Sequence, residues 1–136
     1  MNAADKYKVD LAYIIDDDEV IIYLTDLLVK NVEFCDKLSS FTDADKAMIA
    51  LKESIISGKD LPSVILIDLN MPIKDGWAFL DELSAMQLKQ EIPVFIFTSS
   101  INPVDIEKAK NYPIVKDYVI KPLTIHKINK ILRLIK

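Results

Sequence analysis

Short apolar runs alternate along the chain with longer segments in which apolar residues recur every three or four positions. The short runs are rich in β-branched and aromatic residues, which favour strands. They predict strands over residues 9–15, 33–41, 63–69, 93–98 and 118–121. Residues 63–69 (SVILIDL) and 93–98 (PVFIFT) are apolar on both faces, as is typical of parallel strands covered by helices.

The longer segments predict five helices, over residues 20–29, 44–55, 76–86, 103–110 and 125–135. Start signals support three of them: a segment resembling a capping box over residues 42–45, Asn102 before Pro103, and Thr124. The apolar positions expected to face the sheet are Ile21, Leu24 and Leu28; Ala44, Ala47, Met48, Leu51 and Ile55; Phe79, Leu80 and Leu83; and Ile125, Ile128, Leu132 and Ile135.

Five βα units in 136 residues predict an α/β fold, a doubly wound domain around a parallel sheet. We expect residues 1–136 to form this single domain, with no output domain. Apolar residues make up 51% of the chain and its net charge is −4, which disfavours nucleic acid as a primary partner. No signal peptide and no stretch of roughly 18 apolar residues is present, so we expect a cytoplasmic protein without a membrane partner. The single Cys35 excludes an internal disulfide and is expected to be a buried, inert thiol.

Acidic, basic and hydroxyl side chains stand at the carboxyl ends of four predicted strands. In order they are Asp16, Asp17 and Asp18; Asp68; Thr98; and Lys121. Ligands of open α/β sheets bind at this edge, so these side chains are expected to converge. Convergent carboxylates repel one another unless cations sit among them. Lys121 supplies one positive charge, and Mg2+ suits the remaining carboxylate oxygens. Such a site would neutralise an incoming phosphoryl group, and Thr98 could donate a hydrogen bond to it.

Four segments of the chain closely resemble the signature segments of response-regulator receiver domains of two-component systems. They are YIIDDDE, VILIDLNMPIKDGWAFL, VFIFTSS and DYVIKPL, in the family's order and covering essentially the whole chain. The resemblance implies a flavodoxin-like sheet of strand order 2-1-3-4-5 with five helices. It also implies that Asp68 is the phosphoacceptor and that Mg2+ is bound by Asp16, Asp17, Asp68 and the backbone carbonyl of Asn70.

Three further residues take roles from the same resemblance. Thr98 matches the switch hydroxyl, Lys121 the lysine that pairs with phosphoryl oxygens, and Tyr118 the aromatic whose rotation accompanies activation. Pro122 follows Lys121 where the family usually has a cis peptide bond.

Two features leave room for departures from the family pattern. The triple aspartate leaves the register of the acidic pair open by one residue. We choose Asp16 and Asp17 because Ile15 ends the apolar strand just before them, and Asp18 is then expected to cap the following helix. Residues 111–116 lack the small Gly-Ala segment common before the last strand, so the shape of that loop is open.

The function implied is that of a single-domain, chemotaxis-regulator-like response regulator. It would accept a phosphoryl group from a sensor histidine kinase or a histidine phosphotransfer protein. It would then change its affinity for an unknown downstream protein through the face of helix 4, strand 5 and helix 5, with a phosphorylation-linked homodimer as a further partner. It would catalyse only its own phosphorylation and dephosphorylation.

Several alternatives stay open at this point. The chain could pass the phosphoryl group on as a relay intermediate. An aspartate-nucleophile phosphohydrolase of the haloacid dehalogenase type, or a phosphate-independent interaction module, would be a different class of protein. The basic residues of the last helix, Lys127, Lys130, Arg133 and Lys136, are either simply solvated or a docking surface for an acidic partner.

Overall fold

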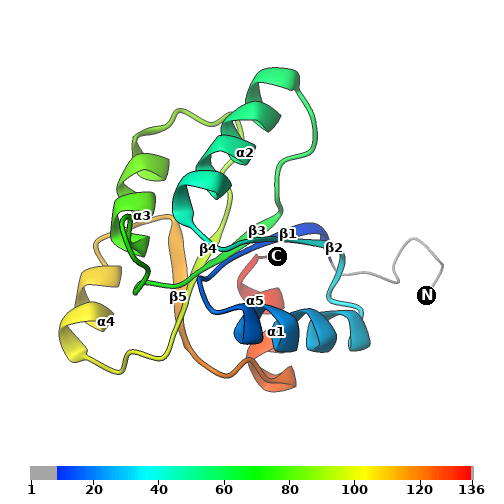
Figure 1. The fold of residues 1–136 in the computed structure, drawn as a ribbon, viewed down its shortest axis with the longest axis vertical. Coiled ribbons are helices and arrows are strands. Elements are labelled where there is room, and N and C mark those ends of the chain that lie inside the picture. Colours follow the sequence, from blue (N-terminus) through cyan, green and yellow to red (C-terminus); the bar gives the residue numbers. More distant parts are fainter. Residues whose placement is uncertain (1–8, 136) are drawn as a thin grey trace.

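Strands and helices alternate throughout the part of the chain that the structure, a computed structural model, describes, residues 9–135. The strands are β1 (Val9–Ile15), β2 (Cys35–Phe41), β3 (Val64–Ile67), β4 (Val94–Thr98) and β5 (Val115–Ile120). The helices are α1 (Glu19–Asn31), α2 (Ala44–Ser57), α3 (Gly76–Ala85), α4 (Pro103–Ala109) and α5 (Ile125–Ile135). All neighbouring strands are parallel, in the order β2-β1-β3-β4-β5, which confirms the predicted topology (Figure 1).

The sheet is the middle layer of three. Helices α1 and α5 cover one face, and α2, α3 and α4 lie on the other (Figure 1). Successive side chains of a strand point to opposite faces. Accordingly, Ile14 belongs to a buried cluster with Val29 of α1 and Ile128 of α5. The next residue, Ile15, belongs to a second cluster with Phe79 of α3. Every residue of β3 and β4 is buried, as the apolar runs predict for central strands.

Several element boundaries differ from the predicted ones. β2 begins at Cys35 because Glu33, with φ 56°, has a left-handed backbone that still belongs to the turn after α1. β5 begins at Val115, three residues earlier than predicted, because its pairing with β4 extends back to Val94. The cap of α2 is Asp43, whose carboxylate accepts a hydrogen bond from the Lys46 amide at 2.7 Å. Long-range pairing and turn geometry, rather than apolar periodicity, therefore determine these ends.

The inner face of α1 is not the one that the apolar spacing predicts. Thr25 and Val29 are its buried residues, whereas Leu24 is 54% exposed. Apolar residues surround much of this helix, so sequence spacing alone does not identify the face that meets the sheet. In α5 the buried residues are Ile128 and Ile131, and the predicted Ile125 is exposed.

The loop between α4 and β5 is held against α3 by Tyr112. The Tyr112 ring stacks on Trp77 of α3, with ring centroids 5.6 Å apart. The Tyr112 hydroxyl donates to Asp81, also of α3, at 2.6 Å. These contacts join the loop to α3 without the small Gly-Ala segment that the resemblance led us to look for. No helix within residues 9–135 is long and apolar enough to cross a membrane.

Candidate functional site

Three charged side chains from different strands meet at the carboxyl edge of the sheet. Asp16 follows β1, Asp68 follows β3, and Lys121 follows β5. The Lys121 Nζ lies 2.6 Å from Asp16 Oδ2 and 3.3 Å from Asp68 Oδ2. Asp16 is 0% and Asp68 7% exposed, and the Lys121 side chain is 11% exposed. The structure thus brings together three residues that the sequence predicts to share a site.

The two carboxylates are oriented by the backbone that follows each of them. Asp16 Oδ1 accepts a hydrogen bond from the Asp18 amide at 2.9 Å. Asp68 Oδ1 accepts one from the Leu69 amide at 2.8 Å. In both side chains the other oxygen, Oδ2, is the one that approaches Lys121. One oxygen of each carboxylate is therefore held by the chain, and the second faces the lysine.

The D-x-N-M-P-x-x-D-G segment folds as it does because its last two residues begin α3. Asp75 caps this helix by accepting a hydrogen bond from the Ala78 amide at 2.9 Å. Gly76 lies directly against the backbone of Asp68, and a Cβ on it would stand 2.3 Å from the Asp68 carbonyl oxygen. The missing side chain of Gly76 therefore allows α3 to begin on top of the Asp68 backbone.

Burial and charge oppose one another in the Asp16–Lys121 pair. Burial raises the pKa of Asp16, and the nearby Lys121 ammonium only partly offsets this. Burial alone would lower the pKa of Lys121, but the attraction of Asp16 and Asp68 outweighs it, so the lysine pKa is raised. Asp16 Oδ2 is buried and lies within ion-pair distance of Lys121, yet within residues 9–135 it has no partner with the angles of a hydrogen bond. A single lysine leaves this oxygen incompletely satisfied.

An acidic cluster suited to a hard cation surrounds this oxygen. Asp16, Asp17 and Asp68 each offer a carboxylate oxygen, and these oxygens lie within 4.8 Å of one another. Asp17 is exposed, which leaves room for water on one side of the cluster. A few carboxylates completed by several waters form the environment that Mg2+ prefers. The donor set and the under-satisfied Asp16 oxygen therefore fit a magnesium ion.

The three consecutive aspartates have different surroundings: Asp18 caps α1, and Asp16 and Asp17 lie in the acidic cluster. Asp18 is the N-cap of α1, and its Oδ1 accepts hydrogen bonds from the amides of Val20 at 2.9 Å and Ile21 at 3.3 Å. Its carboxylate is thus used by the helix, whereas those of Asp16 and Asp17 face the cluster with Asp68. Asn70 lies two residues beyond Asp68 and is exposed.

Thr98 and Tyr118 are linked through a residue between them in space, Ser100. The Ser100 amide donates to Thr98 Oγ1 at 3.3 Å, and the Tyr118 hydroxyl donates to the Ser100 carbonyl at 2.9 Å. The Ser100 hydroxyl in turn donates to Asp105 Oδ2 in α4 at 2.7 Å. Sequence patterns did not predict the Ser100–Asp105 pair. The available signal was the position of Ser100 shortly before a predicted helix whose first turn contains Asp105.

The β5–α5 connection also follows the expectation. The Lys121–Pro122 peptide bond is cis. The Lys121 amide donates to the Thr98 carbonyl at 2.8 Å, which joins the ends of β4 and β5 beside the site.

Residues 12–133 match the family model of the response regulator receiver domain. The chain belongs to this family. It is 30% identical to a two-component response regulator from Cytophaga hutchinsonii, with a TM-score of 0.85 over 93% of this chain and 96% of that one. It is 25% identical to the Mn(2+)-bound form of response regulator Rcp1, with a TM-score of 0.72 over 91% of this chain and 89% of that one.

A curated relative is the probable methanogenesis regulatory protein FilR2 of Methanothrix harundinacea (strain 6Ac). It is 28% identical over 103 residues, which are 76% of this receiver domain and 66% of FilR2. A second curated relative is covered over only 47% of its length. The receiver domain thus spans two thirds or less of the length of these relatives.

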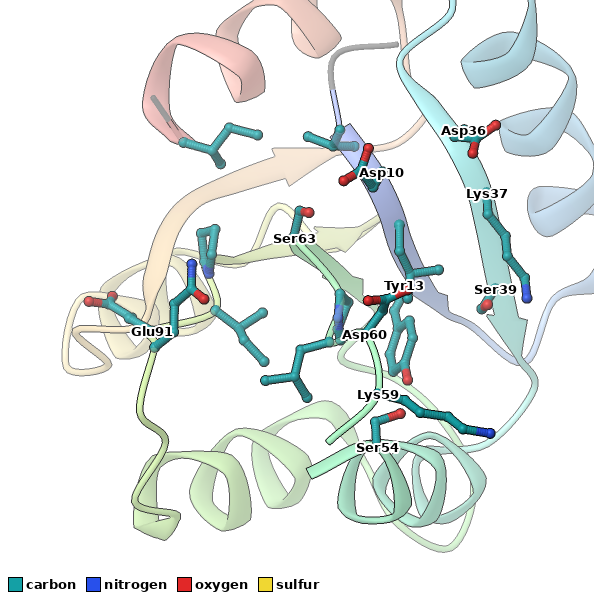
Figure 2. Close-up of a pocket in the computed structure, with 18 of the residues that line it drawn as sticks. Asp10, Tyr13, Asp36, Lys37, Ser39, Ser54, Lys59, Asp60, Ser63 and Glu91 are labelled. Carbon is teal, nitrogen blue, oxygen red and sulfur yellow. The ribbon is translucent and has the colours of Figure 1, made fainter. Parts of the chain in front are cut away.

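A broad hollow of the receiver domain lies at the opposite edge of the sheet (Figure 2). It measures about 1190 Å³, and its lining combines residues near the starts of β1, β3 and β4 with residues of β2 and the end of α5. Both acidic and basic side chains line it, among them Asp10, Lys59 and Glu91, and neither Asp68 nor Lys121 does. We assign this hollow no role, because no reacting group of the site reaches it.

Proposed function

We propose that this receiver domain accepts a phosphoryl group on Asp68, in a Mg2+-dependent reaction, from a histidine kinase or a histidine phosphotransfer protein. The observation that carries the proposal is the shared lysine. Lys121 Nζ contacts Asp68 Oδ2 and Asp16 Oδ2 together, at the edge where ligands of this fold bind. This geometry supports Asp68 as the acceptor, because an incoming phosphoryl oxygen would meet a positive charge already in place.

The acidic cluster supports a divalent ion beside Asp68. Asp16, Asp17 and Asp68 would hold it, together with the backbone carbonyl of Asn70. When bound, Mg2+ supplies positive charge that offsets the phosphoryl oxygens during transfer. Rcp1 is a relative whose structure contains Mn(2+), an ion with the same preference for oxygen ligands.

The remaining residues of the site orient the phosphoryl group and neutralise its charge. The Asp68 carboxylate forms a bond to phosphorus while the bond from phosphorus to the donor histidine nitrogen breaks, which leaves an acyl phosphate. Lys121, whose Nζ lies 3.3 Å from Asp68 Oδ2, pairs with one phosphoryl oxygen. The Thr98 hydroxyl donates to another phosphoryl oxygen, and its own oxygen still accepts the Ser100 amide. Positioning and charge account for most of the catalysis in such transfers.

The output is a change in partner binding through α4, β5 and α5. Thr98, Ser100 and Tyr118 form a continuous hydrogen-bonded path from the site to β5. Ser100 extends this path to α4 through Asp105. A phosphoryl group that draws Thr98 toward Asp68 would pull on both elements. The path therefore supports a switch whose signal leaves by this face, whether toward a target protein or toward a further phosphotransfer protein.

No observation favours the aspartate-nucleophile phosphohydrolase. Such enzymes carry a D-x-D motif at the end of their first strand. The candidate nucleophile here follows β3, and the residue two positions after it is Asn70 rather than an aspartate. The family match likewise lies with the receivers.

Acetyl phosphate with Mg2+, followed by intact-mass measurement, tests the proposed function. The wild-type protein should gain the mass of one phosphoryl group, and Asp68→Asn should gain none. Asp36→Asn, in an exposed residue of β2 away from the site, is the matched control and should be modified like the wild type. Persistent acid-labile labelling of Asp68→Asn would contradict the assignment of the acceptor.

A further inference from the structure

Lys127 in the first turn of α5 turns its side chain back onto the β5–α5 loop. Its Nζ donates hydrogen bonds to the carbonyl oxygens of Ile120, at 2.5 Å, and Pro122, at 2.9 Å. Its backbone amide donates to Thr124 Oγ1 at 3.2 Å, so Thr124 caps the helix as predicted. Lys127 is thus bound to the loop by its side chain and to the helix cap by its backbone.

This position is an unfavourable one for a lysine in general. The first turn of a helix carries the positive end of the helix dipole, where acidic residues are stabilising and basic ones are not. The first turn of α5 contains no acidic residue, and the helix's Arg133 lies in the last turn, where a positive charge is favourable. Lys127 breaks this rule, and its two carbonyl contacts are what offset the repulsion.

The basic residues of α5 therefore do not form one uniform face. Lys130, one turn further on, pairs with Asp117 of β5 at 3.1 Å, and its side chain is 59% exposed. Lys127 instead points back to the loop that precedes the helix. Within the described residues, neither of the two roles expected for the basic face, solvation or docking of an acidic partner, accounts for the placement of Lys127.

The two carbonyls that Lys127 binds belong to the residues on either side of Lys121. The Lys121 amide is held separately by the Thr98 carbonyl at 2.8 Å. The backbone from which the Lys121 side chain starts is therefore fixed before it, at it and after it. A lysine side chain has several rotatable bonds, so the position of its ammonium depends on how firmly its backbone is held.

We propose that Lys127 is a positioning residue that holds the β5–α5 loop so that the Lys121 ammonium stays on Asp16 and Asp68. Hydrogen bonds from a charged donor are stronger than neutral ones, and one ammonium here joins two points of the loop. The consequence for phosphoryl transfer rests on the proposed function. The role of Lys127 in fixing the loop is independent of the proposed function and can be measured in the unphosphorylated protein.

The first measurement is amide hydrogen exchange at Lys121, followed by NMR in the wild type and three variants. Lys127→Met keeps a long apolar side chain without the ammonium, Lys127→Arg retains a charged donor, and Lys130→Met removes the same charge one turn away. In Lys127→Met the Lys121 amide should exchange about tenfold faster, because the charged hydrogen-bond donor that joins the two sides of Lys121 is lost. Lys127→Arg should restore slow exchange, and Lys130→Met should match the wild type.

The second measurement is phosphorylation by acetyl phosphate over a range of Mg2+ concentrations. Lys127→Met should lower the maximal rate about tenfold. This loss is smaller than the roughly 10²-fold loss of rate that a 1 Å misplacement of a reacting group can cause. The half-saturating Mg2+ concentration should not change, because Lys127 does not contact the acidic cluster. A variant that merely unfolds more readily would instead show a lower melting temperature and a higher half-saturating Mg2+ concentration, because only its folded fraction binds the ion.

Two results would overturn the role of Lys127. One is an unchanged Lys121 exchange rate in Lys127→Met. The other is an equal loss of phosphorylation rate in Lys130→Met, which would indicate a general charge effect. If the wild type accepts no phosphoryl group at all, the proposed function fails, while the exchange measurement still decides whether Lys127 holds the loop.

Discussion

Gly76 lies so close to Asp68 that a Cβ on this glycine would stand 2.3 Å from the Asp68 carbonyl oxygen and 2.9 Å from the Leu69 Cα. Both atoms belong to the backbone, so neither can move aside as a side chain would. The start of α3 and the candidate phosphoacceptor are therefore in direct contact. Anything that displaces one of them displaces the other.

Gly76→Ala is expected to destabilise the fold by about 1–3 kcal/mol, the usual effect of overpacking a dense region. It should also lower phosphorylation by acetyl phosphate, because relief of the clash moves the Asp68 backbone. Urea unfolding and intact-mass measurement would check the two effects. Gly58→Ala is the matched control: Gly58 has φ 71°, and a Cβ added there would meet no heavy atom within 4 Å, so only backbone strain of roughly 1–2 kcal/mol is expected. Equal effects of both variants on phosphorylation would contradict the contact as the cause.

Millimolar Mg2+ should raise the melting temperature of the protein. Without a cation, Asp16, Asp17 and Asp68 repel one another, and only Asp16 and Asp68 pair with Lys121. A ligand that binds only the folded state stabilises it by mass action. Asp17→Asn should reduce the shift and should raise the melting temperature in the absence of Mg2+, since it removes one of the repelling charges. Differential scanning calorimetry with and without Mg2+ gives both values. Wild-type melting that is indifferent to Mg2+ would argue against a metal site.

The lifetime of phospho-Asp68 should be minutes rather than seconds. In receivers, the side chains two residues past the acceptor and two past the switch hydroxyl flank the path of the hydrolytic water, and here they are Asn70 and Ser100. The Ser100 hydroxyl donates to Asp105 and accepts the Asn102 amide, so it is engaged at the start of α4 and is a weak aid to hydrolysis.

Ser100→Glu should shorten this lifetime, because a carboxylate can orient or deprotonate water, effects worth about 10²-fold when fully expressed. Asn70→Ala should lengthen it by removing an amide that orients water. Phosphate release after a single round of phosphorylation measures the rate. Unchanged rates in both variants would remove this account of the lifetime without affecting the family assignment.

Cys35 should be almost unreactive toward iodoacetamide while the protein is folded. Burial raises the pKa of its thiol to about 11, with Asp26 nearby adding to the effect. Relative to an ordinary thiol, the thiolate fraction at pH 8 is about 10²-fold lower, and only the thiolate reacts. Urea should expose the thiol and restore ordinary reactivity, as mass spectrometry would show.

The raised pKa of Cys35 also predicts how the stability of the protein changes with pH. A thiol pKa that is higher in the folded state means that the folded protein retains a proton that the unfolded chain loses. The contribution of Cys35 to stability should therefore be complete below about pH 9 and decline as the pH rises toward about 11. Cys35→Ala should show a smaller decline over that range in urea unfolding experiments. Identical pH dependence in the two proteins would show that Cys35 does not contribute.

The amino-acid sequence by itself determined the order of strands and helices and the edge of the sheet on which the site lies. The strands are encoded by local apolar runs, and in a parallel sheet their carboxyl ends all lie at one edge. The residues directly after β1, β3 and β5 therefore lie at the same edge of the sheet, although Lys121 stands 53 positions from Asp68 in the sequence. The same local signals, together with the strand boundary at Ile15, separated the capping Asp18 from the acidic pair.

Only the tertiary structure decided which atoms of these residues face one another. The start of β5, the exposed Leu24 on α1 and the Ser100–Asp105 pair all depend on how neighbouring elements pack. Lys127 is the clearest case, since its sequence position places it among the basic residues of α5 while its ammonium binds the loop before the helix. Apolar periodicity indicates the buried face of an element only where a single face is apolar, which is not the case in α1, and a long polar side chain can reach several partners. Which of them it binds is set by distances between elements that no local pattern contains.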